Sequence, residues 1–303
     1  MKLFSVNTEV LPRVRLIGHV NYTKPWKHFR RISDEYIMYF IKRGELFMKE
    51  GDKKYKLKRG DVFLLEPNVC HEGYKESCCH YYYIHFKHDG ISDLSGKTDN
   101  EIVEDLKMKR KLSLTSNIYN ENMPMNSIYY FEKKFHYEKE NELFSKLAEA
   151  DYDFYQGFEN YKVITSLKFS ELIIGMCRQY TTKRLDSSGT HFSKSFKEIR
   201  CIINYIKKNY SKKITSNDIE DISEYNFNYI DRVFQKMTGH TIFNYLNMIR
   251  IKKSQELIYS TSLKFSQIGY LVGIEDPYYF SKLFKKFTGM TASEYSKLRF
   301  AQK

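Results

Sequence analysis

The sequence predicts a two-domain α+β fold, with an antiparallel β domain and trailing helices followed by an all-α domain. Three observations support this prediction, beside a length of 303 residues that suits two domains. Short β-rich runs with glycine-containing turns occupy residues 36–86. Apolar residues follow a helical period from Glu138 onward. A stretch that begins at Asn226 is repeated 50 residues later, which indicates a duplicated helical unit.

The first part of the chain has the pattern of a small β structure. Residues 1–30 are hard to place, because Pro12, Pro25 and Trp26 interrupt any helical period. The β-rich runs are Tyr36–Ile41, Leu46–Met48, Tyr55–Lys58, Val62–Leu65 and Tyr81–Phe86, with turns predicted at 42–45, 50–52 and 59–61. Short strands at this spacing indicate a small antiparallel barrel or sandwich.

The middle of the chain changes from an ambiguous segment to helices. Residues 91–135 are charged and contain only a weak strand pattern at Ser127–Phe131. Apolar residues spaced for buried helix faces follow, among them Leu143, Phe144, Leu147, Phe154, Phe158, Tyr161, Ile164, Leu167, Leu172, Ile173 and Met176. These faces either cover the β domain or pair two copies of the chain, and both interpretations stay open. The polar, glycine-containing segment Arg184–Ser193 has the composition of a linker.

The repeated stretch has the start and stop signals of a short helix. Asn226 and Asp276 suit the N-cap position in the two copies, and Pro277 suits the first helical position. Gly239 and Gly289 suit the left-handed residue that ends a helix. The predicted apolar face consists of Tyr229, Ile230, Val233 and Phe234 in the first copy and Tyr279, Phe280, Leu283 and Phe284 in the second.

A short helix is predicted ahead of each copy, at Ser216–Ile222 and Ser266–Val272, which gives two helix-turn-helix units. The polar faces of the repeated helices carry side chains that can bind base edges or phosphates. They are Asn228, Asp231, Arg232, Gln235 and Lys236 in the first helix and Tyr278, Ser281, Lys282, Lys285 and Lys286 in the second. A repeat that serves packing alone is the alternative. The polar faces favour binding to DNA.

Residues 195–303 closely resemble the DNA-binding domain of AraC/XylS-type transcription regulators. The most specific signature is the run from Val272 to Ser281, followed by Phe284-Lys285-Lys286 and Thr288-Gly289. The family pattern of a helix, a helix-turn-helix, a connecting helix, a second helix-turn-helix and a closing helix corresponds here to Phe196–Tyr210, Thr215–Met237, Ile242–Tyr259, Phe265–Phe287 and Ala292–Leu298. Three positions depart from the pattern: Glu220, where the family usually has a small alanine, its counterpart Gly269, and Ile274 in place of a phenylalanine.

Residues 20–90 resemble the cupin-like sensor domain of many such regulators, though with looser motifs. The matching residues are Lys58–Leu65 with Pro67, His71-Glu72-Gly73 and Tyr83–Phe86. The resemblance implies a small-molecule effector inside a barrel and helices that pair two sensor domains. We therefore expect a cupin-like effector-binding domain over 1–135, a helical dimerisation or packing segment over 136–182, a linker over 183–194 and the DNA-binding domain over 195–303.

The candidate effector residues are Arg31, Tyr39, His71, Tyr83 and His85. Tyr83 and His85 share one strand face, Arg31 offers donors for a hydroxyl or carboxylate, and aromatic faces suit a sugar. A metal-binding cupin needs an H-x-H motif, and only His71 stands near the place of a ligand, so we expect no metal and no cofactor. Nucleophile-elbow, phosphate-loop and zinc-protease motifs are absent from the sequence, which argues against an enzyme.

Charge and cysteine content agree with this interpretation. The net charge is +13, and residues 191–303 contribute 19 Lys and Arg against 10 Asp and Glu, as expected for phosphate binding. No apolar run reaches the length of a membrane span, and the N-terminus has no secretory pattern. Five cysteines without a C-x-x-C motif suit reduced thiols in a cytoplasm.

The predicted function is a transcription regulator, specifically an activator, that responds to a sugar or sugar derivative. Its expected partners are double-stranded DNA with direct repeats, the effector, a second copy of the chain and RNA polymerase. Arg232 and Lys282, then Asn228 and Tyr278, are the expected base contacts, whereas Lys236, Lys285 and Lys286 suit phosphates. An effector-independent repressor and a cupin enzyme fused to a DNA-binding domain are the alternatives.

Overall fold

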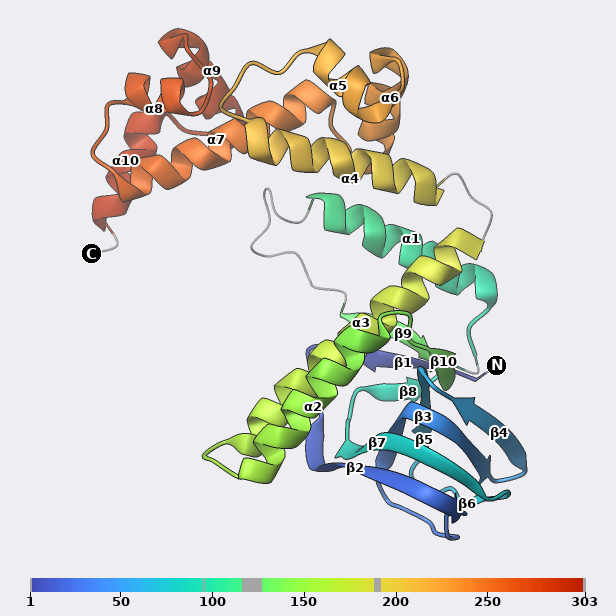
Figure 1. Cartoon of the computed structure of the whole chain (residues 1–303). Coiled ribbons are helices and arrows are strands. Elements are labelled where there is room, and N and C mark those ends of the chain that lie inside the picture. The colour runs from blue at the N-terminus through green and yellow to red at the C-terminus, as the bar shows by residue number, and fades with distance from the viewer. Residues whose placement is uncertain (1, 95, 116–126, 188–191, 302–303) are drawn as a thin grey trace. The chain divides into compact units, whose positions relative to one another are not determined.

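A computed structural model describes residues 2–94, 96–115, 127–187 and 192–301 (Figure 1). The chain forms two units, each with its own core. Unit 1 comprises Met1–Ile102 and Met125–Arg184, and unit 2 comprises Val103–Pro124 and Leu185–Lys303. The α+β class predicted from the sequence is confirmed, since unit 1 holds the strands and unit 2 is helical.

Unit 1 is built on antiparallel sheets. Its strands are β1 (Leu3–Asn7), β2 (Arg13–Trp26), β3 (Tyr36–Glu50), β4 (Lys53–Lys58), β5 (Asp61–Leu65), β6 (His71–Gly73), β7 (Ser77–Lys87), β8 (Ile91–Asp93), β9 (Ile128–Glu132) and β10 (Lys134–His136). One sheet has the order β8-β1-β9, and the larger one has the order β10-β5-β3-β7-β2, with β4 and β6 also paired to β3.

The long strand β3 corrects the predicted turn at 42–45. Its first half pairs with β5 and β7, and its second half pairs with β4 and β6. The register shifts between Ile41 and Arg43, and Gly44 has a φ of 75°. A side chain on Gly44 would overlap the Cys78 carbonyl oxygen. The glycine therefore marks a bulge that bends one strand between two sets of partners, not a reversal of the chain.

Strand β2 lies in the part of the sequence that showed no period. It pairs with β7 from Arg13 to Trp26, and the pairing is irregular between Tyr22 and Trp26, where Pro25 stands. A proline is tolerated in a strand where the ladder is interrupted, because no backbone N–H is needed there. The prolines therefore mark the ends of regular pairing and do not exclude a strand.

Two helices pack on the larger sheet, as the helical period predicted. They are α2 (Glu140–Gln156) and α3 (Tyr161–Ser187), joined by Gly157 in the left-handed conformation. Leu143, Leu147 and Phe169 are buried in one core cluster with Ile84 and Phe86 of β7. One apolar face of the helical pair therefore covers the sheet.

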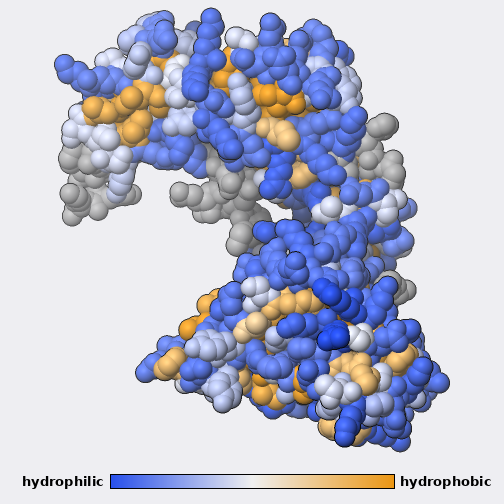
Figure 2. Space-filling model, in the orientation of Figure 1, coloured by the Kyte–Doolittle hydropathy of each residue, from blue (hydrophilic) through white to orange (hydrophobic). Residues whose placement is uncertain are grey.

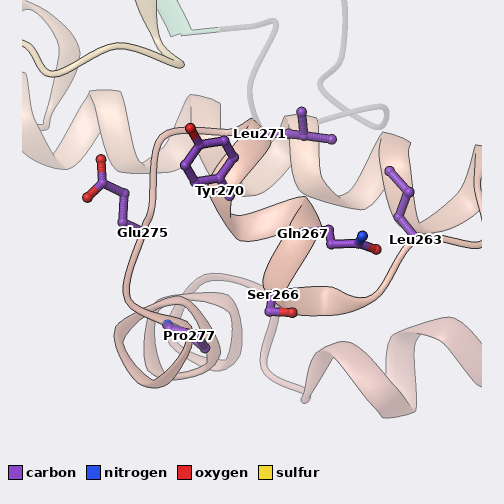
Figure 3. Close-up of a pocket in the computed structure, with 7 residues that line it drawn as sticks. All are labelled: Leu263, Ser266, Gln267, Tyr270, Leu271, Glu275 and Pro277. Atoms are coloured by element: carbon purple, nitrogen blue, oxygen red, sulfur yellow. The ribbon is translucent and has the colours of Figure 1, made fainter.

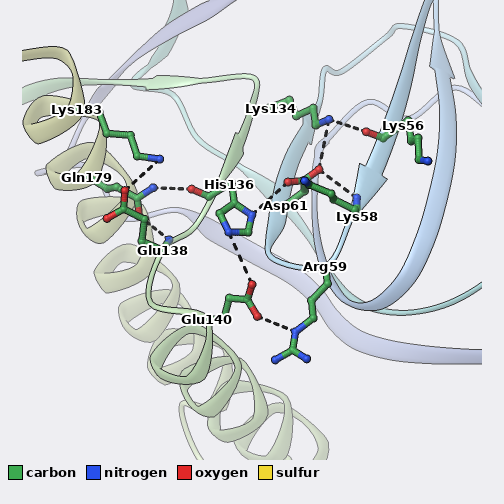
Figure 4. A network of polar contacts seen from close by, with 10 residues as sticks. All are labelled: Lys56, Lys58, Arg59, Asp61, Lys134, His136, Glu138, Glu140, Gln179 and Lys183. Carbon is green, nitrogen blue, oxygen red and sulfur yellow. Dashed lines mark hydrogen bonds and ion pairs between the residues drawn. The ribbon is translucent and has the colours of Figure 1, made fainter. Parts of the chain in front are cut away.

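A network of polar contacts ties α2 and β10 to the turn before β5 (Figure 4). The Asp61 carboxylate accepts a hydrogen bond from Lys58 N at 3.1 Å and lies 3.5 Å from His136 Nδ1. His136 Nε2 lies 3.7 Å from Glu140, which also accepts a 2.7 Å hydrogen bond from Arg59 Nε. The turn is left-handed at Gly60, where a side chain would overlap the His136 ring.

A second network of ion pairs joins the two sheets and is buried at its Lys133 and Glu50 end. The Lys133 side chain is 3% exposed, contacts Glu50, and lies 2.6 Å from Glu66. Glu66 is also 2.6 Å from Lys2, which in turn lies 3.0 Å from Asp93 of β8. Opposite charges alternate along this chain of contacts, so each buried charge has a partner.

Unit 2 follows the predicted helix order closely. Its helices are α4 (Phe192–Asn209), α5 (Ser216–Ser223), α6 (Phe227–Thr238), α7 (Ile242–Ser260), α8 (Phe265–Leu271), α9 (Pro277–Thr288) and α10 (Ala292–Ala301). Most of the visible surface is hydrophilic, and apolar patches interrupt it in both units (Figure 2). Within the described residues, no helix combines the length and apolar character of a membrane span.

Helix α1 (Asp99–Thr115) was not predicted, and it places residues 103–115 in unit 2 instead of the expected effector-binding domain over 1–135. Leu114 is 6% exposed and belongs to the core cluster of Phe196 and Ile199. Tyr245 Oη donates a 3.1 Å hydrogen bond to the Leu114 carbonyl, and the Arg110 guanidinium lies 5.0 Å over the Phe196 ring. Apolar burial therefore assigns this segment to unit 2.

The expected linker over 183–194 is also shorter than its composition suggested. Helix α3 continues to Ser187, and helix α4 begins at Phe192. Leu185 is fully buried, which explains why the helix extends beyond the first polar residues. Residues 188–191 lie outside the described part of the chain.

Candidate functional site

The two repeated helices, α6 and α9, begin and end where the sequence predicted. The Asn226 side chain accepts a 3.0 Å hydrogen bond from Asn228 N, and Asp276 accepts one of 2.8 Å from Tyr278 N. Gly239 and Gly289 both have a φ of 81°. These caps satisfy backbone groups that a helix end leaves free, so each helix is defined by its own sequence.

Two departures from the family pattern set the geometry of the helix-turn-helix units. Glu220 of α5 accepts a 2.6 Å hydrogen bond from Phe227 N, at the free start of α6. At Gly269 of α8, a Cβ would stand 3.0 Å from the Ile274 carbonyl oxygen and 3.3 Å from the Phe280 ring. In the first helix-turn-helix, a carboxylate of α5 therefore caps α6. In the second, α8 approaches Ile274 and Phe280 closely because residue 269 is a glycine.

The predicted apolar faces are confirmed except at their edges. Ile230 and Phe234 are buried in α6, and Phe280 and Phe284 are buried in α9. Tyr229 and Tyr279, the outermost members of the predicted faces, are instead exposed. A tyrosine suits the edge of an apolar stripe because its hydroxyl can stay hydrated.

Most of the predicted DNA-contacting side chains lie at the surface. Asn228, Arg232, Gln235, Lys236, Tyr278, Ser281, Lys282, Lys285 and Lys286 are exposed. Asp231 differs: it is half-buried, and its carboxylate accepts a 2.7 Å hydrogen bond from Ile242 N at the start of α7. A carboxylate that caps a neighbouring helix is held by that contact. Asp231 therefore positions α6 against α7.

The exposed cations of α6 and α9 are not neutralised within the protein. Among the residues that the structure describes, no carboxylate lies within 4.0 Å of Arg232, Lys236, Lys282, Lys285 or Lys286. The Arg232 guanidinium donates a 3.1 Å hydrogen bond to the Asn228 carbonyl of its own helix. Unpaired surface cations attract phosphates and release counterions when they bind DNA.

A pocket of about 530 Å³ lies beside α8 and the start of α9 (Figure 3). Its lining residues are Leu263, Ser266, Gln267, Tyr270, Leu271, Glu275 and Pro277. The lining contains one carboxylate and no basic side chain, which does not suit a phosphate. We therefore do not assign this pocket to DNA binding.

In unit 1 the structure brings together all five candidate effector residues. Arg31 Nε donates to His71 Nε2 at 3.1 Å, and its Nη2 lies 3.4 Å from His85 Nε2. The Tyr83 and His85 rings meet edge to face with centroids 5.8 Å apart. Tyr39 pairs directly with Tyr83 across β3 and β7. We call these five residues and the neighbours described next the effector cluster.

Several neighbours in this cluster carry no recognisable signal in the sequence. His28 Nε2 lies 3.0 Å from the Tyr39 hydroxyl, and Arg15 Nη2 lies 3.1 Å from His85 Nδ1. Arg15 Nε donates a 2.6 Å hydrogen bond to Glu35. The rings of Tyr22 and Trp26 stack at 4.1 Å. Three of these residues lie on β2, so recognising that strand would have revealed them.

Comparison with known proteins agrees with both halves of this arrangement. One family model, described as a helix-turn-helix domain, matches residues 222–298, and another, described as an AraC-like ligand binding domain, matches residues 16–101. Together they cover more than half of the chain. The uncharacterized HTH-type transcriptional regulator YisR of Bacillus subtilis is 25% identical over 93% of this chain and 92% of its own length. The chain belongs to the AraC family.

Two further similarities cover smaller parts of this AraC-family chain. The lactose operon transcription activator of Staphylococcus xylosus is 34% identical over 32% of this chain, but the match spans only 35% of that relative. The C-terminal domain of AraT, a response regulator from Geobacillus stearothermophilus, is 28% identical and covers 33% of this chain and 84% of that domain, with a TM-score of 0.32.

Burial sets the charge state of the imidazoles in the effector cluster. Together with the nearby Arg31 guanidinium, it lowers the pKa of His28 and of His85 to about 4. Burial also lowers the pKa of His71. These imidazoles are neutral at neutral pH, so each offers one donor and one acceptor.

Within the described residues, no group of three or more His, Cys, Asp or Glu side chains is arranged to hold a metal ion. His71 and His85 instead accept or share hydrogen bonds with Arg31, and His28 with Tyr39. The cluster therefore has the chemistry of a polar binding site with aromatic walls.

Acid should weaken the fold of unit 1 through these imidazoles. His28 and His85 have pKa values of about 4 when folded and 6.5 when unfolded, so between those values the unfolded chain binds more protons. Stability is therefore full above about pH 6.5 and falls toward pH 4, by roughly 2 kcal/mol per histidine after solvent screening. Urea unfolding followed by Trp26 fluorescence measures this loss.

The matched variant His28→Asn removes one of the two titrating groups. Its stability should depend less steeply on pH than that of the wild type over the same range. An unchanged slope would show that His28 does not titrate as described.

Proposed function

We propose that this AraC-family regulator is an activator whose DNA binding is controlled by a small molecule held in the effector cluster. The observation that carries the proposal is the presence, in one chain, of two capped helices with unpaired cations and a cluster of neutral imidazoles, tyrosines and two arginines. Activation adds RNA polymerase as a further partner, and the cytoplasm is where such a regulator meets DNA.

We propose that α6 and α9 enter successive major grooves on one face of the duplex, roughly 34 Å apart. Arg232 and Lys282 hold corresponding positions and are the proposed base contacts, with Asn228 and Tyr278 beside them. The remaining exposed side chains suit phosphates and sugars, namely Gln235, Lys236, Ser281, Lys285 and Lys286. The two helix-turn-helix units are direct repeats of each other in the sequence. We therefore expect the two DNA segments that they bind to be direct repeats as well.

Replacing Arg232 by alanine should cost about 1–3 kcal/mol on the cognate site and relax base preference at one position. A guanidinium that binds a guanine edge discriminates against other bases, whereas a phosphate contact does not. Titration of wild type and variant against a set of singly substituted sites measures both effects.

The neighbouring Lys236→Ala variant is the matched control. It should weaken binding about equally on all sequences and reduce the salt dependence by about one counterion. If Arg232→Ala behaves in the same way, Arg232 contacts a phosphate and the proposed base contact is wrong.

We propose a sugar or sugar derivative as the effector. The stacked rings of Tyr22 and Trp26 and the partly buried Tyr83, with Tyr39 packed behind them, give aromatic surface for a sugar face. His71, His85 and Arg31 supply hydrogen-bonding groups for hydroxyls. A relative of this chain is named as a lactose operon activator, which favours the same class.

We further propose that α2 and α3 pair two copies of the chain. While one face of these helices covers the sheet, large apolar side chains stand exposed near the turn that joins them. They are Tyr152, Tyr155, Phe158, Val163, Ile164 and Leu167, and Tyr155 is 86% exposed. A closed two-fold contact between identical patches would cover them.

Leu167→Lys should therefore shift a dimer toward monomer, because it places a charge in the apolar contact. Sedimentation equilibrium measures the change, and Lys162→Ala, an exposed neighbour on α3, serves as the control. A monomeric wild type, or a Leu167→Lys dimer of unchanged affinity, would contradict this surface.

A further inference from the structure

The charges of the effector cluster do not balance. Glu35 is buried and accepts a 2.6 Å hydrogen bond from Arg15, so these two charges compensate each other. Arg31 is half-buried, and among the described residues no carboxylate lies within 4.0 Å of its guanidinium. The guanidinium instead contacts the imidazoles of His71 and His85 and the Phe29 ring. The cluster therefore carries one positive charge without a counterion.

The imidazoles do not compensate this charge. His71 Nε2 accepts a hydrogen bond from Arg31, and a neutral ring accepts only through a lone pair. Burial and the Arg31 guanidinium both lower the pKa of His28, His71 and His85, so the neutral form of all three rings is favoured. A partly buried charge that meets only neutral groups loses hydration without gaining an ion pair.

The backbone holds Arg31 at this place. Arg31 N donates to the His71 carbonyl at 3.0 Å, and His71 N donates to the Arg31 carbonyl at 2.9 Å. Gly73 N donates to the His28 carbonyl at 2.9 Å, and a side chain on Gly73 would meet the His28 backbone. Backbone hydrogen bonds thus hold residues 28–33 against residues 68–73. Arg31 is a fixed cation and not a side chain on a loose loop.

Four side chains of the cluster reach the surface in part. Tyr22, Trp26, Arg31 and Tyr83 are each only partly buried, whereas Tyr39, His71 and His85 behind them are buried. A guanidinium presents its donors in a planar fork that matches the oxygens of a carboxylate or phosphate. A ring bound at the aromatic side chains would bring an anionic substituent to Arg31.

We propose that the effector is an anion, namely a sugar-sized molecule whose carboxylate or phosphate group binds Arg31. This inference rests on the proposed function of the cluster as the effector site. The anion supplies the counterion that Arg31 lacks, with His71 and His85 as additional hydrogen-bonding groups. A neutral sugar leaves the charge uncompensated, so the site discriminates between a sugar and its acidic or phosphorylated derivative.

The test uses the full-length protein and matched ligands at constant ionic strength. Thermal unfolding is followed in glucose, glucuronate, glucose 6-phosphate and inorganic phosphate, and DNA affinity is measured with the same ligands. Glucuronate or glucose 6-phosphate should raise the unfolding midpoint more than glucose does, and the better of the two identifies the carboxylate or the phosphate as the recognised group. Inorganic phosphate shows how much the anion contributes without the ring.

Arg31→Gln should bind the anionic ligand at least about tenfold more weakly, as expected for the loss of a charged hydrogen-bond pair. Arg43→Gln, an exposed arginine on β3, should bind it like the wild type. Arg31→Lys keeps the charge and serves as the second variant, and an unchanged urea midpoint of Trp26 fluorescence shows that unit 1 is folded in each variant.

Two results would overturn the inference. If glucose stabilises the protein as well as the anions do, or if Arg31→Gln retains full affinity, the effector is not recognised through its charge. If glucose stabilises the protein as well as the anions do and also changes DNA affinity, the proposed function stands and only this inference fails. If no ligand of either kind changes the midpoint or DNA affinity, both fail.

Discussion

Replacing Phe284 by alanine should destabilise the second helix-turn-helix unit by about 3–5 kcal/mol. The Phe284 side chain is fully buried in the core cluster formed by α7, α8, α9 and α10. Its ring lies 5.8 Å from that of Phe280 and 5.6 Å from that of Tyr295. Because a small domain is stable by only about 5–15 kcal/mol, this loss removes a large part of its stability.

The loss should be visible both in stability and in DNA binding. Hydrogen exchange at α9 should accelerate, and the variant should lose protection over one of the two DNA segments at temperatures where the wild type binds both. Tyr278→Ala, in the same helix but 79% exposed, is the control and should leave exchange unchanged while it weakens DNA binding. Equal exchange in the two variants would contradict the described core.

Replacing Lys133 by methionine should have a comparable effect on unit 1. Lys133 is 3% exposed and contacts both Glu50 and Glu66. Methionine has a similar length but leaves two carboxylates without their shared cation. Removing one member of a buried ion pair costs about 3–5 kcal/mol, because the remaining charge stays buried. Of these two carboxylates, Lys2 contacts Glu66 alone, so it does not replace Lys133 at Glu50.

Trp26 makes this prediction easy to measure. It is the single tryptophan of the chain and lies on β2, so its fluorescence reports on unit 1 alone. The urea midpoint of this signal should fall in Lys133→Met and stay unchanged in Lys53→Ala, an exposed lysine of β4. DNA binding without effector should survive in both variants. An unchanged midpoint in Lys133→Met would contradict the buried network.

The C-terminal half of the fold could be predicted from the sequence because its signals are local. Asn226, Asp276, Gly239 and Gly289 act within a few residues of their own helix, and each was recognised as a cap from its position alone. The role of Asp231 could not be recognised in this way. It depends on the approach of α7, whose first residue, Ile242, lies 11 residues further along the chain.

The strands and helices of the N-terminal half depend on contacts between residues that are far apart in the sequence, which a local pattern does not reveal. The bulge near Gly44 and the irregular pairing around Pro25 both lie where β3 and β2 pair with β7, which is distant from them in sequence. Helix α1 has a weak apolar face of its own, and Leu114 is buried only because α4 and α7 supply the other side of the core. Such long-range contacts decide structure where local preference is weak.

In the candidate effector site, a sequence pattern reveals some of the residues and not others. The alternation of β7 placed Tyr83 and His85 on one face, which a strand pattern is able to reveal. Arg31 and His71 meet through an isolated antiparallel bridge that no sequence pattern indicated. Arg15, His28 and Glu35 were missed because their segment had no recognisable period.

Footprinting of the full-length protein on DNA upstream of its own gene, with and without the matched sugars and sugar anions, tests the central claim most directly. The account predicts two protected segments about one helical turn apart on one face of the duplex, with protection that changes when an effector is added. Protection that ignores every ligand would favour an effector-independent repressor. Absence of protection there and on genomic DNA as a whole would contradict the assignment as a DNA-binding regulator.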